Sequence, residues 1–219
     1  MKTRLFLFSA ICIAAINLHA APLNVVKVNA PAYNCLFSAN CIITVNDTVD
    51  HFTTNLPPYT VGSTNPALSG FLQSRTFKAE PGTPEAGQYG YEYRLVLQKL
   101  TGVKSVTINS MTINFSPYSS FTYKGHPKKE VWVVTSGGLG STGPGSATTS
   151  GTTVTFHFNP PLKLTNTASQ ETSSYFFGMA SPTPPPAAAN SLANFTGTEQ
   201  LTGGGTIPFN FLILHVRTP

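Results

Sequence analysis

Residues 88–99 alternate strictly between two kinds of side chain, and this pattern constrains the fold more than any other feature of the sequence. One set is aromatic or aliphatic and comprises Tyr89, Tyr91, Tyr93, Leu95 and Leu97. The other set comprises Glu92, Arg94, Val96 and Gln98. A period of two is typical of a β-strand with one buried face. We therefore expect the tyrosines and leucines to enter a core, and Glu92 and Arg94 to lie on a solvated face.

Shorter segments of the same kind recur at fairly regular intervals, separated by turn-forming residues. The expected strands are 23–29, 41–45, 70–78, 106–115, 130–135, 152–158, 174–179 and 207–216. Many short strands without a long helical pattern predict an all-β fold, an antiparallel β-sandwich of jelly-roll or immunoglobulin-like type. A parity change between Asn109 and Met111 fits either a bulge or two short strands. In strand 130–135, Trp132 alternates with two valines, so we expect both faces to be covered.

Two segments of biased composition interrupt this pattern. Residues 136–153 are rich in glycine, serine and threonine and predict an exposed, ordered loop whose glycines adopt positive φ. No lysine follows these glycines, so they do not form a phosphate-binding loop. Residues 181–190 are rich in proline and alanine and fit either a domain boundary or an extended connector. We expect a connector, because the final strand needs a partner sheet.

The N-terminus has the pattern of a secretory signal peptide, with Lys2 and Arg4 ahead of an apolar run over residues 5–18. Cleavage before Ala21 leaves one domain over residues 21–219. A membrane anchor is the alternative, but the run is shorter than the roughly 20 residues that cross a bilayer. Lipid attachment at Cys12 is a further alternative, for which the residues ahead of this cysteine match poorly. The expected location is secreted or periplasmic.

Cleavage would also remove Cys12 and leave Cys35 and Cys41 as the cysteines of the mature chain. Cysteines of exported proteins meet an oxidising environment, in which disulfides form and persist. We therefore expect a disulfide between Cys35 and Cys41.

Charge and motifs exclude several classes of function. The formal net charge of the whole chain is +5, two of these charges are in the leader, and the remaining basic residues are scattered. This distribution does not predict a nucleic-acid interface. The histidines lack the spacing of metal ligands, and the sequence contains no nucleotide or cofactor motif. We expect neither a metal nor a cofactor.

Signals for catalysis are weak. A Ser/His/Asp triad could use Asp47 or Asp50, but no local motif marks one. A glycosidase needs two facing carboxylates, and Glu92 is the carboxylate that stands out, because Arg94 lies two residues further along the same strand. A solvated ion pair is the simpler interpretation.

The candidate ligand-binding residues come from this strand face and from a polar segment rich in turns. Arg75 lies in a neighbouring strand pattern and could join Glu92 and Arg94. Tyr118 and Tyr123 are candidate surface rings for stacking on sugars. The full candidate set is Glu92, Arg94, Arg75, Tyr118 and Tyr123.

Four segments resemble the shared segments of a family of exported bacterial β-rich proteins without an assigned activity. They are 70–77 (GFLQSRTF), 89–95 (YGYEYRL), 133–141 (VVTSGGLGS) and 174–181 (SYFFGMAS), and the resemblance extends over about residues 35–181. Some similar proteins carry further cysteines near the positions of Lys104 and Leu162 and an acidic glycine-rich turn near residues 123–129. This chain lacks both features, so neither a second disulfide nor a calcium site is implied.

These observations predict an exported β-sandwich that binds a glycan or another surface protein, or otherwise contributes to the cell exterior, without catalysis. One alternative is a secreted hydrolase of glycans or esters, for which the distinguishing feature is two facing carboxylates or a Ser–His pair in one cleft. A second alternative is a structural subunit of a surface assembly, for which the sign is an uncovered apolar edge strand.

Overall fold

The computed structural model describes residues 20–57, 67–167, 171–189 and 191–219. The expected leader lies outside the described residues except for Ala20, as does most of the connection after Asn55. The described part is an all-β sandwich, which confirms the expected fold class. No helix of the described ranges has the length and apolar character of a membrane span.

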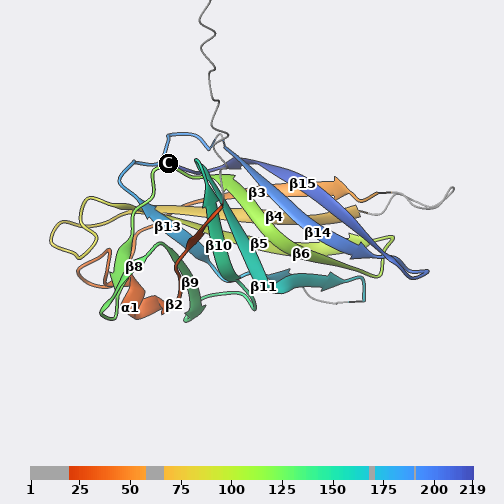
Figure 1. Ribbon diagram of the computed structural model, residues 1–219, viewed down its shortest axis with the longest axis horizontal. Helices are drawn as coiled ribbons and strands as arrows, with labels where there is room; N and C mark the ends of the chain where they lie inside the picture. Colours follow the sequence, from red (N-terminus) through yellow and green to blue (C-terminus); the bar gives the residue numbers. More distant parts are fainter. Residues whose placement is uncertain (1–19, 58–66, 168–170, 190) are drawn as a thin grey trace, which may run out of the picture.

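Two large sheets and one small hairpin make up the molecule (Figure 1). The first sheet has the order β1-β10-β11-β6-β14-β15, and the second has the order β2-β9-β13-β5-β4-β3, with the short β12 beside β5. All pairings are antiparallel except that of β2 with β9. The elements are β1 (Ala21–Leu23), β2 (Val25–Asn29), α1 (Ala30–Asn34), β3 (Asn46–Asn55), β4 (Ala67–Lys78), β5 (Tyr89–Thr101), β6 (Ser105–Asn114), β7 (Phe121–Tyr123), β8 (His126–Lys129), β9 (Val131–Ser136), β10 (Pro144–Ser150), β11 (Thr153–Thr165), β12 (Thr172–Ser173), β13 (Phe177–Ser181), β14 (Ser191–Gln200) and β15 (Thr206–Val216).

The main core lies between the two large sheets. Tyr91, Tyr93, Leu95 and Leu97 of β5 are fully buried there, as the alternation predicts. Where β6 pairs with β14, Ser110 lies opposite Thr196 and Ile108 lies opposite Gly197. Asn109 therefore forms a bulge within a single strand. Of the two expected explanations for the parity change, the bulge is confirmed. β14 and β15 pair with β6 in the first sheet, so the chain on both sides of the proline-rich connector shares one core.

Several expected local structures are wrong. Residues 23–29 form two strands in different sheets, because the chain crosses between the sheets at Asn24. Residues 41–45 are not a strand. The expected loop 136–153 contains β10, which pairs with β1 and β11 and buries Ala147, while Gly137, Gly140 and Gly151 do have positive φ. β3 and β14 were not expected, because polar or small residues occupy most of their positions.

A third layer covers one end of the outer face of the second sheet. It consists of α1, the segment that follows it and the β7–β8 hairpin, and α1 and β8 lie together at the same end of the sandwich in Figure 1. A second apolar cluster fills the space beneath this layer. Its buried members are Val28, Tyr33, Phe37, Phe77, Ala79, Phe121, Tyr123, Trp132, Val134, Phe176 and Ala180. Trp132 is buried in this cluster, whereas its neighbours Val131 and Val133 enter the main core, so both faces of β9 are covered as expected.

The disulfide between Cys35 and Cys41 is present, as expected. It closes the segment that leaves α1 and returns toward β3. The small third layer is therefore linked covalently at the point where its chain turns back.

Candidate functional site

One transverse row of residues crosses the outer face of the second sheet. Asp47 of β3 pairs with Arg75 of β4, Arg75 pairs with Glu92 of β5, Glu92 pairs with Gly178 of β13, and Gly178 pairs with Trp132 of β9. Directly opposed residues of adjacent strands project from the same face of a sheet. The register therefore brings together an acid, a base, a second acid and an indole from four strands, with Gly178 of β13 between the second acid and the indole.

Glu92 is buried beneath the third layer, with only 5% of its surface exposed. Its Oε1 accepts a hydrogen bond of 3.0 Å from Nε1 of Trp132. Burial raises the pKa of Glu92 to about 7, although Trp132 and the nearby Arg75 favour the charged form. The expectation of a solvated Glu92 is wrong, because the apolar side chains of the third layer cover this part of β5.

Gly178 lies between Trp132 and Glu92 in the sheet and allows β13 to approach β5 closely. A Cβ atom at this position would lie 2.0 Å from the carbonyl oxygen of Tyr91, which is closer than atoms in contact can approach. Close backbone approach is one reason for a glycine within a strand. The indole of Trp132 reaches the carboxylate of Glu92 across β13.

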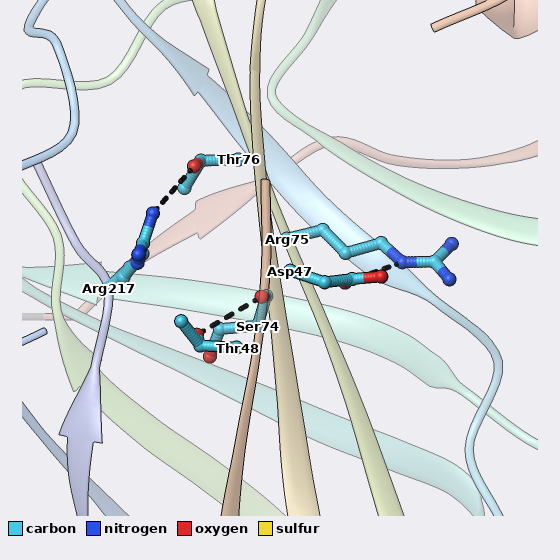
Figure 2. Close-up of polar contacts among 6 residues, drawn as sticks. All are labelled: Asp47, Thr48, Ser74, Arg75, Thr76 and Arg217. Atoms are coloured by element: carbon cyan, nitrogen blue, oxygen red, sulfur yellow. Dashed lines mark hydrogen bonds and ion pairs between the residues drawn. The ribbon is translucent and has the colours of Figure 1, made fainter. Parts of the chain in front are cut away.

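Arg75 forms an ion pair with Asp47, not with Glu92. Its Nε donates to Oδ1 of Asp47 at 3.0 Å (Figure 2). The guanidinium carbon of Arg75 also lies 3.8 Å from the centre of the Phe176 ring, a cation–π distance. In Figure 2, Arg75 and Thr76 project from opposite sides of β4, and Thr76 accepts a hydrogen bond from Arg217.

Arg94 lies further along β5 and makes no ion pair with Glu92. Its Nη2 donates to Oγ of Ser173 at 3.0 Å, and its guanidinium carbon is 5.9 Å from the centre of the Phe176 ring. Its Nε is buried without a hydrogen-bond partner. Burial lowers the pKa of Arg94. Both arginines thus lie near the ring of Phe176.

Tyr33 of α1 covers the row from above. Its side chain is 1% exposed, and its ring centre lies 4.9 Å from that of Trp132. Its buried hydroxyl lies beside the carboxyl group of Glu92, outside strict hydrogen-bond geometry. Burial raises the pKa of Tyr33, and the charge of Glu92, the interaction of the hydroxyl with that carboxyl group and the charge of Glu85 raise it further.

A cavity of about 330 Å³ opens over this row. Arg75, Glu92 and Tyr33 contribute polar groups to its lining. The apolar residues at its mouth include Val45 and Leu139, whose side chains are 38% and 56% exposed. The complete lining is Ala30, Tyr33, Asn34, Ile43, Val45, Arg75, Phe77, Glu92, Val134, Gly137, Gly138, Leu139 and Phe176.

The structure brings together three of the five candidate ligand-binding residues. Arg75 and Glu92 line the cavity, and Arg94 lies beside it against Phe176. Tyr123 is not a surface residue: it is 4% exposed in the second apolar cluster, and its hydroxyl accepts a hydrogen bond from the backbone N–H of Asn29. Tyr118 is half-buried against the main core. The expectation of two surface rings is therefore wrong for Tyr123, whose hairpin folds onto the sheet.

Sequence reasoning missed the contributions of Tyr33, Asp47 and Phe176. Asp47 was considered only as a member of a triad, and Tyr33 and Phe176 had no pattern that separated them from core aromatics. A usable signal was the set of four segments that carry the family resemblance. Each of them supplies residues of this cavity: Arg75 and Phe77, Glu92, residues 134 and 137–139, and Phe176.

No group of three or more His, Cys, Asp or Glu side chains suited to a metal ion occurs among the described residues. Comparison of the chain with protein-family models, with curated proteins and with solved structures gives no match. The function must therefore be inferred from the site itself.

Proposed function

We propose that this protein is exported and acts outside the cytoplasm as a binding protein without catalytic activity, and that its ligand occupies the cavity over Glu92. One observation carries this proposal. Tyr33 of α1, Arg75 of β4 and Glu92 of β5 line the same cavity, and Glu92 is buried there. Small-molecule sites are typically apolar cavities into which a small number of polar groups converge.

Export is supported by the N-terminal sequence and by the disulfide. Residues 1–20 have the composition of a signal peptide, and a disulfide joins Cys35 to Cys41. Disulfides persist mainly in oxidising compartments. A secreted or periplasmic location is consistent with both features.

The family resemblance supports the position of the site. Its four segments lie far apart in the sequence, yet each contributes to the lining of this one cavity. The segments lie on β4, β5, β9 and β13, which are neighbouring strands of the second sheet, so the sheet brings them together on one face.

The composition of the lining argues for binding rather than hydrolysis. Among the described residues, the cavity lining contains one carboxylate, that of Glu92, and neither serine nor histidine. Asp47, the nearest acid in the row, is held by Arg75. A glycosidase needs two free carboxyl groups across the substrate, and a serine hydrolase needs a nucleophile with a base.

A thermal-shift screen of glycans and small molecules on the mature protein tests the proposal, because a ligand that binds only the native state raises the melting temperature. The substitution Ala30→Phe fills the cavity, whereas Ala32→Phe places the same side chain on the exposed side of the same short helix. We expect a hit whose shift disappears in Ala30→Phe and persists in Ala32→Phe. A shift that persists in both variants would place the ligand elsewhere and overturn this assignment.

A second candidate function, a structural subunit of a surface assembly, is favoured by the edge strand β15. This strand ends the first sheet, and Leu192, Leu212 and Leu214 on β14 and β15 are about half exposed. Exposed apolar edges are sites of strand pairing between chains. Light scattering as a function of concentration tests this candidate: self-association that Leu212→Lys with Leu214→Lys abolishes would support it, and a monomer at all concentrations would contradict it.

A further inference from the structure

We propose that the cavity over Glu92 binds a small monocarboxylic acid with an apolar tail, with the carboxylate at Arg75 and the tail toward Val45 and Leu139. The inference rests on the proposed function, because it names the class of ligand for the same site. Three properties of the cavity carry it: its free hydrogen-bond donors, its charge and its apolar mouth.

The free donors are the terminal nitrogens of Arg75. Nε of Arg75 is bonded to Asp47, and its terminal nitrogens make no hydrogen bond to another described residue; they extend beyond the Asp47 contact in Figure 2. The buried Tyr33 hydroxyl lies beside the carboxyl group of Glu92 and is not free for a ligand. A guanidinium suits a carboxylate, since charge-assisted hydrogen bonds are the strongest available to it.

The charges around the cavity floor also favour an anion. The titratable groups that face Glu92 are Tyr33 on α1, Asp47 on β3, Arg75 on β4 and Arg94 on β5 itself, with Glu85 beyond Tyr33. Trp132 on β9 and Gly178 on β13 carry no charge. When Glu92 is protonated, the two arginines and Asp47 leave one positive charge on this face of the sheet. A ligand with a single negative charge then neutralises the site.

The mouth of the cavity selects the rest of the ligand. Ile43, Val45 and Leu139 are apolar and partly or largely exposed at the mouth. A volume of about 330 Å³ has room for roughly ten water-sized groups. A short aliphatic or aromatic acid such as hexanoate fits these dimensions and covers the exposed apolar side chains.

Sugars fit the site less well. Stacking on a sugar needs an open aromatic face. One face of Phe176 is occupied by Arg75 at 3.8 Å, and Tyr33 is buried against Trp132. Phe77, the third ring of the lining, packs against Tyr33 and Phe37, so each of these rings already contacts protein groups.

Ligand binding should be linked to protonation of Glu92. An anion beside this carboxyl group favours its protonated form, so binding takes up a proton near neutral pH. With a pKa of about 7, the protonated fraction falls about tenfold between pH 6 and pH 8. Hexanoate is ionised at both values, so its dissociation constant should rise by about the same factor.

Isothermal titration calorimetry with hexanoate, hexanamide and hexylamine at pH 6 and pH 8 tests the inference on the unmodified protein. We expect hexanoate to bind about tenfold more tightly at pH 6, and the amide and the amine to bind at least tenfold more weakly than the acid. Equal binding of acid and amide would overturn the inference and leave the proposed function intact. Absence of hexanoate binding would also overturn it, while the proposed function is judged separately by the Ala30→Phe experiment.

Substitutions then locate the carboxylate. Glu92→Gln should remove the pH dependence and retain binding at pH 8, and Arg75→Gln should abolish binding. Lys163→Gln is the matched control, because it removes a positive charge from the exposed face of β11. Equal effects of Arg75→Gln and Lys163→Gln would contradict a specific contact. A carboxyl-terminal leucine carries the same chemistry, so tighter binding of the peptide Gly-Gly-Gly-Leu than of hexanoate would overturn the assignment to a small acid.

Discussion

Nε1 of Trp132 donates a hydrogen bond of 3.0 Å to Oε1 of Glu92 across Gly178, which separates the two residues in the sheet. This contact joins three strands on the outer face of the second sheet. Burial at this position disfavours the charged form of the carboxyl group, and the hydrogen bond from Trp132 offsets part of that effect. The floor of the candidate site is therefore built on the sheet, and α1 and the segment that follows it complete the lining of the cavity.

The raised pKa of Glu92 predicts how stability depends on pH. Because the pKa of the folded protein, about 7, exceeds the ordinary value of 4.5, the stabilisation is complete below pH 4.5 and is lost as the pH rises through 7. We expect the free energy of unfolding of the wild type to fall by about 3 kcal/mol more than that of Glu92→Gln between pH 4.5 and pH 8. Denaturant midpoints of both proteins measure this difference. Parallel pH profiles would contradict it, and Glu171→Gln, at an exposed carboxylate, is the control.

Gly178→Ala should be strongly destabilising. The added Cβ would meet the backbone of β5, which cannot move without breaking the pairing of β5 with β13. We expect a loss of more than about 3 kcal/mol in the free energy of unfolding. Gly203→Ala is the matched control, because nothing lies within 4 Å of its Cβ position. Similar denaturant midpoints for the two variants would contradict the close approach of β13 to β5.

Removal of the disulfide should destabilise the third layer. Six positions separate Cys35 from Cys41, and closing so short a loop contributes about 2 kcal/mol in the chain-entropy model. We expect Cys35→Ala with Cys41→Ala to lower the free energy of unfolding by this amount. Mass spectrometry of the unreduced wild type should show the linked peptide. Two free thiols in the exported protein would contradict the pairing.

Tyr93 anchors the C-terminal segment to the core. Its hydroxyl donates a hydrogen bond of 2.7 Å to the carbonyl oxygen of Arg217, and the side chain is fully buried. Tyr93→Phe leaves that carbonyl without this donor, so we expect a loss of about 1 to 2 kcal/mol in the free energy of unfolding. Tyr118→Phe is the control, because the hydroxyl of Tyr118 makes no hydrogen bond to a described residue. An equal loss in both variants would indicate a general effect of the hydroxyl group.

The inner face of β5 was predictable because it depends on local order. Tyr91, Tyr93, Leu95 and Leu97 alternate with other residues, and a strand that buries one face follows that alternation whatever its partners are. The disulfide was predictable for a similar reason, since it needs only two cysteines and an oxidising compartment. The edge strand β3 was missed because its side chains are mostly polar and give almost no apolar period.

The outer face could not be predicted from periodicity. Glu92 and Arg94 are polar residues on a strand, and such residues are normally solvated. Whether these two side chains are solvated depends on segments distant in the sequence, such as α1 and the β7–β8 hairpin. The apolar side chains of those segments have no regular spacing. The sequence could not predict which arginine pairs with Asp47 either, because the contact with Arg75 follows from the register of β3 on β4.

The sequence by itself determined that the chain forms strands, which face of β5 enters the main core and which cysteines form the bridge. Each of these follows from short-range order or from composition. Only the tertiary structure decided that Asp47, Arg75, Glu92 and Trp132 form one row, that Tyr33 covers it and that a cavity remains above it. The physical reason is that register and layer packing are set by contacts between distant segments, and the free energy of those contacts depends on all the partners at once.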